Sequence, residues 1–372
     1  MTTQFDQTEI EALAATFADR DSVDSETYPA ANLADIKAAG LLGAAFAPNL
    51  SGRGWTLPEA VRALESVAAG SPSTALIWAM PLGLSGVYAL GPDAAPEAHR
   101  PRWSAQIEDV AARYRGGELF AACNSERGAG GSLAATTTVA ARDAEGVFRL
   151  TGEKILASSG PFAQHFFSTA KVTQEDLPGA GIVDFFFVRP DAPGVEVLDD
   201  WDGFGMRSTQ SQTVRYQQAP AWELMGFPNF IEVVHPLQYW FCLFAAIPLG
   251  CARGILQELS RPVPASPAVR LRLAEATMKY ESLRAYLLET AAGWRAGADA
   301  AYASRVLRTK TYVSQEATRL CAELFALGGG RHYRRDGRVA RLLADSFAGT
   351  ALRPPLPLAI DQLTEQFGAT AG

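Results

Sequence analysis

The stretch Cys123-Asn124-Ser125-Glu126-Arg127-Gly128-Ala129-Gly130-Gly131-Ser132 places hydroxyl side chains and glycines in one turn, directly after an apolar run at residues 119–122. Glycine has no Cβ, so a turn of this kind brings bare backbone N–H groups against a flat or anionic ligand. A hairpin loop that binds nothing has a similar composition. The stretch therefore predicts either a ligand-binding turn or a plain loop, and the motifs that follow it decide between the two.

Three later motifs follow this turn in a fixed order along the chain. They are a Ser-rich motif at residues 152–160, a Gly-Met-Arg motif at residues 205–211, and the glycines of residues 328–330 ahead of Asp345. In this order and at this spacing, the chain resembles the acyl-CoA dehydrogenase superfamily of flavoproteins over nearly its whole length. The resemblance favours the ligand-binding interpretation of the first turn.

The composition limits the class of protein. The net charge of -7 and the pI near 5.3 argue against a nucleic-acid-binding protein, because phosphate binding requires Lys and Arg clustered on one face. Four cysteines, Cys123, Cys242, Cys251 and Cys321, are scattered without a C-x-x-C pair. This pattern argues against a disulfide framework and a zinc site, and we expect no metal. A reducing cytoplasm is the simplest setting.

Changes in residue pattern along the 372 residues predict an α+β fold. Helical spacing dominates residues 1–118, and β-branched and aromatic runs dominate residues 119–227. Strands are predicted at residues 147–150, 165–168, 181–188, 195–198 and 213–216. We therefore expect an N-terminal helical domain (1–118), a small central β-domain (119–227) and a C-terminal four-helix bundle (228–372). The resemblance implies the same acyl-CoA dehydrogenase-like architecture.

Two stretches of the C-terminal part need separate interpretation. Residues 236–252 are apolar but contain Gln238 and Pro248 and end at Arg253, whereas a membrane-spanning helix needs about 20 apolar residues. We predict a buried bundle helix and no membrane span. A second predicted helix carries an apolar seam that Lys310 interrupts; this lysine either snorkels to solvent or meets an acid from another helix. The seam consists of Val306, Val313, Ala317, Leu320, Leu324 and Leu327.

The resemblance implies a flavin, FAD, held between the β-domain and the bundle. Ser125 falls where the family's Thr or Ser binds the pyrimidine edge of the ring, and Ser158 falls where a hydroxyl meets flavin N5. Leu156 stands where many members have a Trp beside the ring, and an apolar side chain there can still cover it. The first turn adds Cys123, Gly130 and Gly131 to the expected cofactor site.

The resemblance also implies a homo-oligomer, a tetramer or at least a dimer, because each flavin site in the family uses two subunits. Gly328 and Gly329 fall where a glycine pair lets the dinucleotide of a neighbouring subunit approach the backbone. Phe325 stands where the family has a Gln that contacts the adenosine side. A helix C-cap alone would also explain the two glycines.

The catalytic base of the family is the main departure in this chain. Family dehydrogenases remove a proton beside a thioester carbonyl with a Glu. The matching position is Arg353 for one branch and Trp240 for the other, and neither side chain accepts a proton. If the match is shifted, Glu258 and Glu281 are the nearest candidates for the base. Arg353 and Trp240 remain expected substrate contacts, together with Ser132 for a thioester tail.

Three functions follow from these observations. The first is an FAD-dependent oxidoreductase that acts on a small molecule such as acyl-CoA, with its catalytic Glu replaced and electron-transfer flavoprotein as the acceptor. The alternative is a flavin-dependent monooxygenase of the same fold, served by a flavin reductase, which the chain resembles at residues 158–160 and 205–209. Those relatives usually carry a His near Leu352, where this chain has none; His332 is the only histidine in the last third of the chain. The third is a non-catalytic family member.

Overall fold

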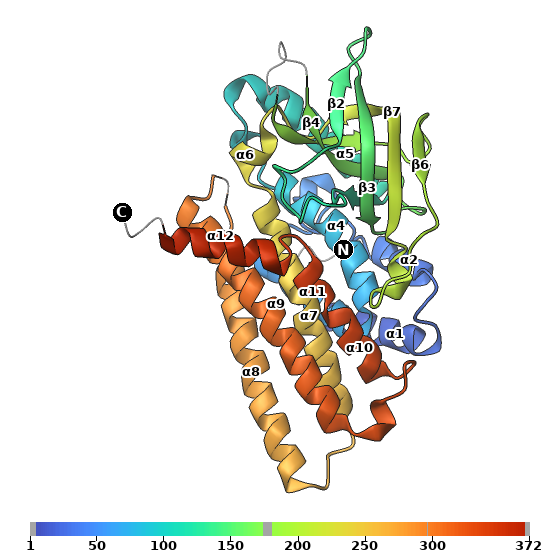
Figure 1. Cartoon of the computed structure of the whole chain (residues 1–372), viewed down its shortest axis with the longest axis vertical. Coiled ribbons are helices and arrows are strands. Elements are labelled where there is room, and N and C mark those ends of the chain that lie inside the picture. The colour runs from blue at the N-terminus through green and yellow to red at the C-terminus, as the bar shows by residue number, and fades with distance from the viewer. Residues whose placement is uncertain (1–4, 174–180, 296, 369–372) are drawn as a thin grey trace.

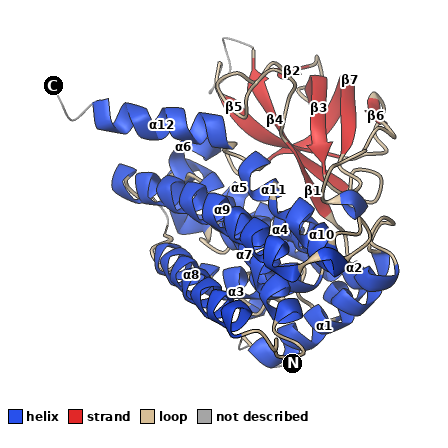
Figure 2. Cartoon of the chain, turned by 60° about the horizontal axis from the view of Figure 1, so that its bottom comes forward, coloured by secondary structure: helices blue, strands red, loops and turns tan. Residues whose placement is uncertain are grey.

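The computed structural model of the chain describes residues 5–173, 181–295 and 297–368. Helices extend to Arg115, strands run from Phe120 to Leu224, and helices return from Phe230 (Figure 1). The predicted α+β fold class is confirmed. Figure 2 shows the strands gathered on one side of the molecule and most of the helices on the other.

The helices are α1 (Gln7–Val23), α2 (Ala30–Ala38), α3 (Leu57–Gly70), α4 (Pro72–Tyr88), α5 (Arg100–Arg115), α6 (Phe230–Val234), α7 (Leu237–Leu259), α8 (Pro267–Ala291), α9 (Ala300–Gly328), α10 (Arg338–Ser346), α11 (Ala348–Ala351) and α12 (Leu356–Gly368). The strands are β1 (Phe120–Cys123), β2 (Val139–Arg142), β3 (Phe148–Ala157), β4 (His165–Val172), β5 (Val183–Val188), β6 (Val195–Val197) and β7 (Gln212–Leu224).

The strands form a small barrel with its own core. The sheet order is β1-β4-β2-β3-β7-β5, β6 pairs with β7, and a further pairing of β4 with β5 closes the ring. Inward-facing side chains such as Leu150, Phe166, Phe186 and Tyr216 fill the interior and are fully or almost fully buried. The apolar run at residues 119–122 falls largely in β1, which pairs in parallel with β4. This pairing places the turn that follows β1 at one edge of the barrel.

Helix α7 is the central helix of the bundle and packs against α3, α4, α8, α9 and α10. It is long and apolar enough to cross a membrane by length and composition, but 89% of its most apolar window is buried inside the fold. The predicted buried helix is therefore confirmed. Gly250 permits the close contact with α3, because a Cβ at this position would lie 2.4 Å from the carbonyl oxygen of Glu65.

One detail of the helical parts differs from the sequence interpretation. Lys310 lies on the buried seam of α9 and neither snorkels nor meets an acid. Its Nζ donates to the carbonyl oxygens of Leu352 and Pro354, both at 2.6 Å. Backbone carbonyls thus take the place of the expected carboxylate.

Candidate functional site

A largely apolar cavity of about 290 Å³ lies between the barrel and the helical bundle. Five of the predicted cofactor and substrate residues line it together, namely Ser125, Leu156, Ser158, Trp240 and Arg353. They come from the turn after β1, from β3 and the turn beyond it, from α7, and from the segment after α11. Among the described residues that line the cavity, Arg353 is the only charged one.

A bulge in β3 presents Leu156 at the rim of this cavity. The register of β3 against β7 shifts between Lys154 and Ala157, and Leu156 adopts a φ of 61°. A left-handed backbone is strained for leucine, and such strain is concentrated at ligand sites. The Leu156 side chain is 49% exposed although it lies beside apolar walls. A flat ligand over Leu156 would explain both its strained backbone and its exposure.

Ser158 is the first donor in a chain of hydrogen-bonded hydroxyl groups. The last group, Thr209, determines which hydroxyl donates and which accepts along the chain. Thr209 Oγ1 donates to the carbonyl oxygen of Met206 at 2.8 Å, so it accepts from Ser211 Oγ at 2.6 Å. Ser211 then accepts from Ser158 Oγ at 2.9 Å. Because the Ser158 proton is directed to Ser211, Ser158 Oγ presents its lone pairs as hydrogen-bond acceptors.

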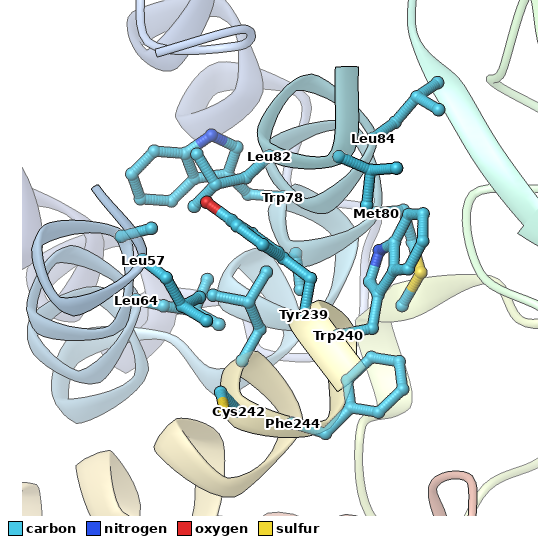
Figure 3. Packing of buried hydrophobic residues seen from close by; sticks show 14 of the residues in the cluster. Leu57, Leu64, Trp78, Met80, Leu82, Leu84, Tyr239, Trp240, Cys242 and Phe244 are labelled. Carbon is cyan, nitrogen blue, oxygen red and sulfur yellow. The ribbon is translucent and has the colours of Figure 1, made fainter. Parts of the chain in front are cut away.

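The wall formed by α7 is aromatic. Trp240 is almost fully buried and stacks on Phe167 of β4, with ring centroids 5.5 Å apart. Figure 3 shows Trp240 beside Met80 of α4, with Phe244 one turn further along α7. Gly83 of α4 lets the indole approach, because a Cβ there would lie 2.1 Å from Trp240 Nε1. Trp240 therefore forms a fixed apolar wall and offers no proton acceptor.

Asp345 connects the bundle to the loop that closes one side of the cavity. Asp345 Oδ1 accepts a hydrogen bond of 2.6 Å from the backbone N–H of Met206, a cavity-lining residue. The neighbouring Gly205 packs so closely on α10 that a Cβ would lie 2.5 Å from the carbonyl oxygen of Ala344. Burial raises the pKa of Asp345 from 3.8 to about 7. Two motifs recognised separately in the sequence thus form one contact.

Replacing Asp345 with Asn should alter the pH dependence of stability. The folded-state pKa of Asp345 is raised, so its stabilising contribution is complete below about pH 4 and is lost as the pH rises through about 7. The D345N variant keeps an oxygen acceptor for Met206 and does not titrate. Relative to the wild type, we expect its free energy of unfolding to improve by up to about 4 kcal/mol between acidic and slightly alkaline pH. Urea unfolding at several pH values measures this difference, and a constant difference would contradict it.

The other predicted cofactor residues do not line the cavity of their own chain. The Cys123 thiol is buried in the barrel core, and burial raises its pKa to about 11. Gly131 has a φ of 83° and approaches Pro355 so closely that a Cβ would lie 2.3 Å from its Cδ. The neighbouring Gly130 also has a positive φ. The Ser132 backbone N–H closes the turn by donating to Ala129.

Phe325, Gly328 and Gly329 lie at the end of α9. Phe325 contacts the ring of Tyr333, with centroids 6.3 Å apart. Gly328 packs on His332, where a Cβ would lie 2.7 Å from the imidazole Cδ2. Gly329 follows α9 with a φ of 71°, a conformation that favours glycine. Contacts within the chain therefore account for these glycines, and their contact with a neighbouring subunit stays a prediction.

The alternative catalytic side chains also lie outside the cavity lining. Glu258 is 3.9 Å from Arg338, in a surface ion pair. Glu281 borders a separate polar hollow beside α8. His332 Nε2 accepts from Arg331 Nε at 2.8 Å and does not line the cavity. None of the three supplies the cavity with a base.

The sequence interpretation missed part of the cavity. Ser211 and Thr209 complete the hydroxyl chain, and the sequence analysis assigned no role to their side chains in the Gly-Met-Arg motif. The aromatic rings of Trp201, Phe204 and Phe347 add to the walls. Phe204 and Phe347 are exposed and make an edge-to-face contact with centroids 6.0 Å apart. Their large exposure was not visible from the sequence, because isolated aromatic residues in loops have no periodic signal.

Comparison with family models gives two matches. Residues 121–219 match the acyl-CoA dehydrogenase middle domain, and residues 254–352 match the acyl-CoA dehydrogenase C-terminal domain. Together the two matches span more than half of the chain.

Curated relatives over most of the chain include two kinds of enzyme. A probable acyl-CoA dehydrogenase of Bacillus subtilis (strain 168), YngJ, is 24% identical over 335 residues, which cover 86% of this chain and 84% of the relative. The amino sugar nitrososynthase DnmZ of Streptomyces peucetius is 26% identical over 358 residues, covering 90% and 85%. The sequence comparison therefore favours neither reaction by identity alone.

Solved structures show the same fold. The KijD3 complex with FMN and dTDP-3-amino-2,3,6-trideoxy-4-keto-3-methyl-D-glucose has a TM-score of 0.82 at 22% identity, and covers 98% of this chain and 94% of KijD3. TdsC of Paenibacillus sp. A11-2 with FMN and indole has a TM-score of 0.79 at 21% identity, with 96% of each chain covered. At these identities the likeness establishes the architecture.

Proposed function

The chain belongs to the acyl-CoA dehydrogenase superfamily, and from that premise we propose that it is a flavin-dependent monooxygenase rather than an acyl-CoA dehydrogenase. The observation that carries this proposal is the cavity lining, which has no Asp or Glu among the described residues. Dehydrogenation of a thioester needs a base within reach of the α-proton. The two base positions of the family hold Arg353 and Trp240, and neither accepts a proton.

The residues of the cavity fit a flavin ring. Leu156 would cover one part of the ring, and Ser125, which pairs with the adjacent Ile155, belongs to the same lining. Ser158 Oγ offers an acceptor, which suits the N–H that a flavin carries at N5 only when reduced. Bound there in its reduced form, a flavin supplies the activation of molecular oxygen. The expected FAD and the FMN named in the KijD3 and TdsC structures share this ring.

The aromatic walls of the cavity suit a substrate with a small apolar ring or chain. Trp240 and the neighbouring aromatic rings exclude water and leave few polar groups to compete with the reacting atom. Among the structural relatives, TdsC is named a dibenzothiophene monooxygenase, and the DnmZ relative is named a nitrososynthase. We infer that this chain oxygenates a nitrogen or sulfur atom of a small molecule, with a flavin reductase as the source of reduced flavin.

We also propose a homodimer or homotetramer. In that assembly the end of α9, with Phe325, Gly328 and Gly329, would approach the flavin of a neighbouring subunit. The family resemblance supports this arrangement. None of these three residues is among the described residues that line the cavity of their own chain. Electron-transfer flavoprotein would be the partner only of a dehydrogenase.

Two measurements on the purified protein test the reaction. The first is made on protein reconstituted with FAD or with FMN and supplied with a flavin reductase and NADH. We expect oxygen consumption to rise when aromatic amines or sulfides are added, and mass spectrometry should find one added oxygen atom in the product. Anaerobic mixing with short- and medium-chain acyl-CoA thioesters should leave the oxidised flavin spectrum unchanged. Rapid bleaching by a thioester would refute the proposal. Reductase without the protein is the control for uncoupled oxygen consumption.

A further inference from the structure

Arg353 has an unused donor beside the aromatic cavity. Its Nη2 donates to the carbonyl oxygen of Asn124 at 3.2 Å. Its Nη1 is buried and has no hydrogen-bond partner among the described residues. Leaving a buried charged donor unpaired is costly, so such a group in a cavity wall points to a ligand that pairs with it. Arg353 remains protonated at neutral pH, since burial lowers its pKa only to about 10.

The surrounding charges do not neutralise Arg353. Glu126 is the acid that acts on Arg353 electrostatically, but its carboxylate is already paired with the buried Lys154 at 2.5 Å. The same carboxylate accepts from Thr137 and from the backbone N–H of Thr138. Two cations therefore share one carboxylate, and the cluster has an excess positive charge next to an apolar space. An anionic group on the ligand would balance it.

Lys310 fixes the backbone on both sides of Arg353. The carbonyl oxygens that accept from Lys310 Nζ belong to Leu352 and Pro354, the two chain neighbours of Arg353. Lys310 itself is 2% exposed and sits on the buried seam of α9. Two short hydrogen bonds from one rigid helix hold this segment in place, so Lys310 is a positioning residue for Arg353.

We propose that Arg353 forms an anion-binding subsite in the wall of the aromatic cavity, and that the substrate carries a carboxylate or a comparable anionic oxygen beside an apolar ring. Guanidinium groups bind carboxylates well because their donors lie in one plane. The identification of the anion as part of the substrate rests on the proposed function. A reduced flavin also carries negative charge on its ring, and the experiment below separates the two sources.

The test compares benzoate with benzamide, an uncharged molecule of nearly the same shape. Dissociation constants are measured by calorimetry on the FMN-loaded protein and on the flavin-free protein. We expect the wild type to bind benzoate about tenfold more tightly than benzamide, the effect of one charge-assisted hydrogen bond. Arg353→Met should abolish this preference, and Arg353→Lys should retain part of it. The surface variant Arg334→Met, which alters an exposed Arg334–Asp336 pair, should leave it unchanged.

Lys310→Met tests the positioning role with the same two ligands. We expect the preference for benzoate to fall while the affinity for benzamide is kept, because the apolar walls are unchanged. Circular dichroism establishes that each variant is folded. If Arg353→Met does not fold, Arg353→Lys replaces it in the comparison. Equal affinity of the wild type for benzoate and benzamide would overturn the proposal.

A second outcome would show that Arg353 pairs with the flavin and not with the substrate. If Arg353→Met weakens binding of reduced FMN tenfold and leaves the benzoate preference intact, the anion belongs to the flavin and the substrate proposal is wrong. These measurements need no turnover. A protein that shows the benzoate preference but no oxygenase activity would refute the proposed function and leave the anion subsite standing.

Discussion

Replacing Glu126 with Leu should destabilise the protein by about 3–5 kcal/mol, because the substitution leaves the buried Lys154 cation without its carboxylate partner. The Lys154 side chain is 0% exposed and its partner Glu126 only 3% exposed, with 2.5 Å between Nζ and Oε1. Without the carboxylate, the one hydrogen-bond partner left to Lys154 Nζ among the described residues is the hydroxyl of Thr169, at 3.1 Å. Thr137 and Thr138 lose their acceptor as well. Urea unfolding followed by circular dichroism measures the loss.

A matched double variant separates the unpaired charge from lost packing. Substituting Lys154 with Met in the Glu126→Leu background removes both charges, and we expect it to recover most of the lost free energy. Lys154→Met alone should be destabilising, since it leaves Glu126 unpaired. A double variant no more stable than Glu126→Leu would contradict this account. So would a decrease of less than about 1 kcal/mol in the free energy of unfolding of Glu126→Leu.

The same pair predicts how the wild type responds to acid. Burial of Glu126 opposes ionisation, but hydrogen bonds from Lys154 and Thr137 outweigh it and lower the pKa of Glu126 from 4.5 to about 2. A lowered folded-state pKa means that the stabilisation is complete above about pH 4.5 and is lost as the pH falls towards 2. Glu126→Leu should therefore lose less stability than the wild type over that range of pH.

The fold was largely predictable because long periodic segments determine it. The seam of α9 and the apolar stretch in α7 each gave a strong helical signal. Helix α7 is largely buried as expected, and α9 buries most of its seam while other residues of the helix are exposed. Strand β2 was missed because its four residues, Val139–Arg142, are half alanine and too short to show alternation. Strand β2 lies between β4 and β3 in the sheet, so without β2 the closure of the barrel was not visible from local sequence.

The candidate site was predictable only in part. Ser125, Leu156, Ser158, Trp240 and Arg353 meet in one cavity as the resemblance implied, although their individual roles stay predictions. The contacts that hold them in place are long-range. Lys310 and Leu352 are 42 residues apart, and the acceptor of Met206 lies 139 residues away. No local pattern brings such pairs together. The first contact depends on how α9 packs on the segment after α11, and the second on how the barrel docks on the bundle.

Replacing Ser158 with Ala should lower kcat for oxygenation about 100-fold, the effect of removing one hydrogen-bonding group that is held in place at a reacting centre. The hydroxyl chain from Met206 through Thr209 and Ser211 leaves Ser158 Oγ as an acceptor facing the cavity. Ser158→Ala should therefore weaken binding of reduced FMN more than binding of oxidised FMN, a difference that fluorescence titration under anaerobic conditions detects.

Two matched variants make the Ser158 prediction specific. Ser208 is buried beside the same segment, has no hydrogen-bond partner for its hydroxyl among the described residues and does not line the cavity, so Ser208→Ala should have little effect on kcat. Ser211→Ala removes the group that directs the Ser158 proton, which frees Ser158 to act as a donor. We expect an intermediate loss of about tenfold, because a donor at this position opposes an N–H on the ligand. Equal preference of wild type and Ser158→Ala for the two redox forms of FMN would show that Ser158 does not act as this acceptor.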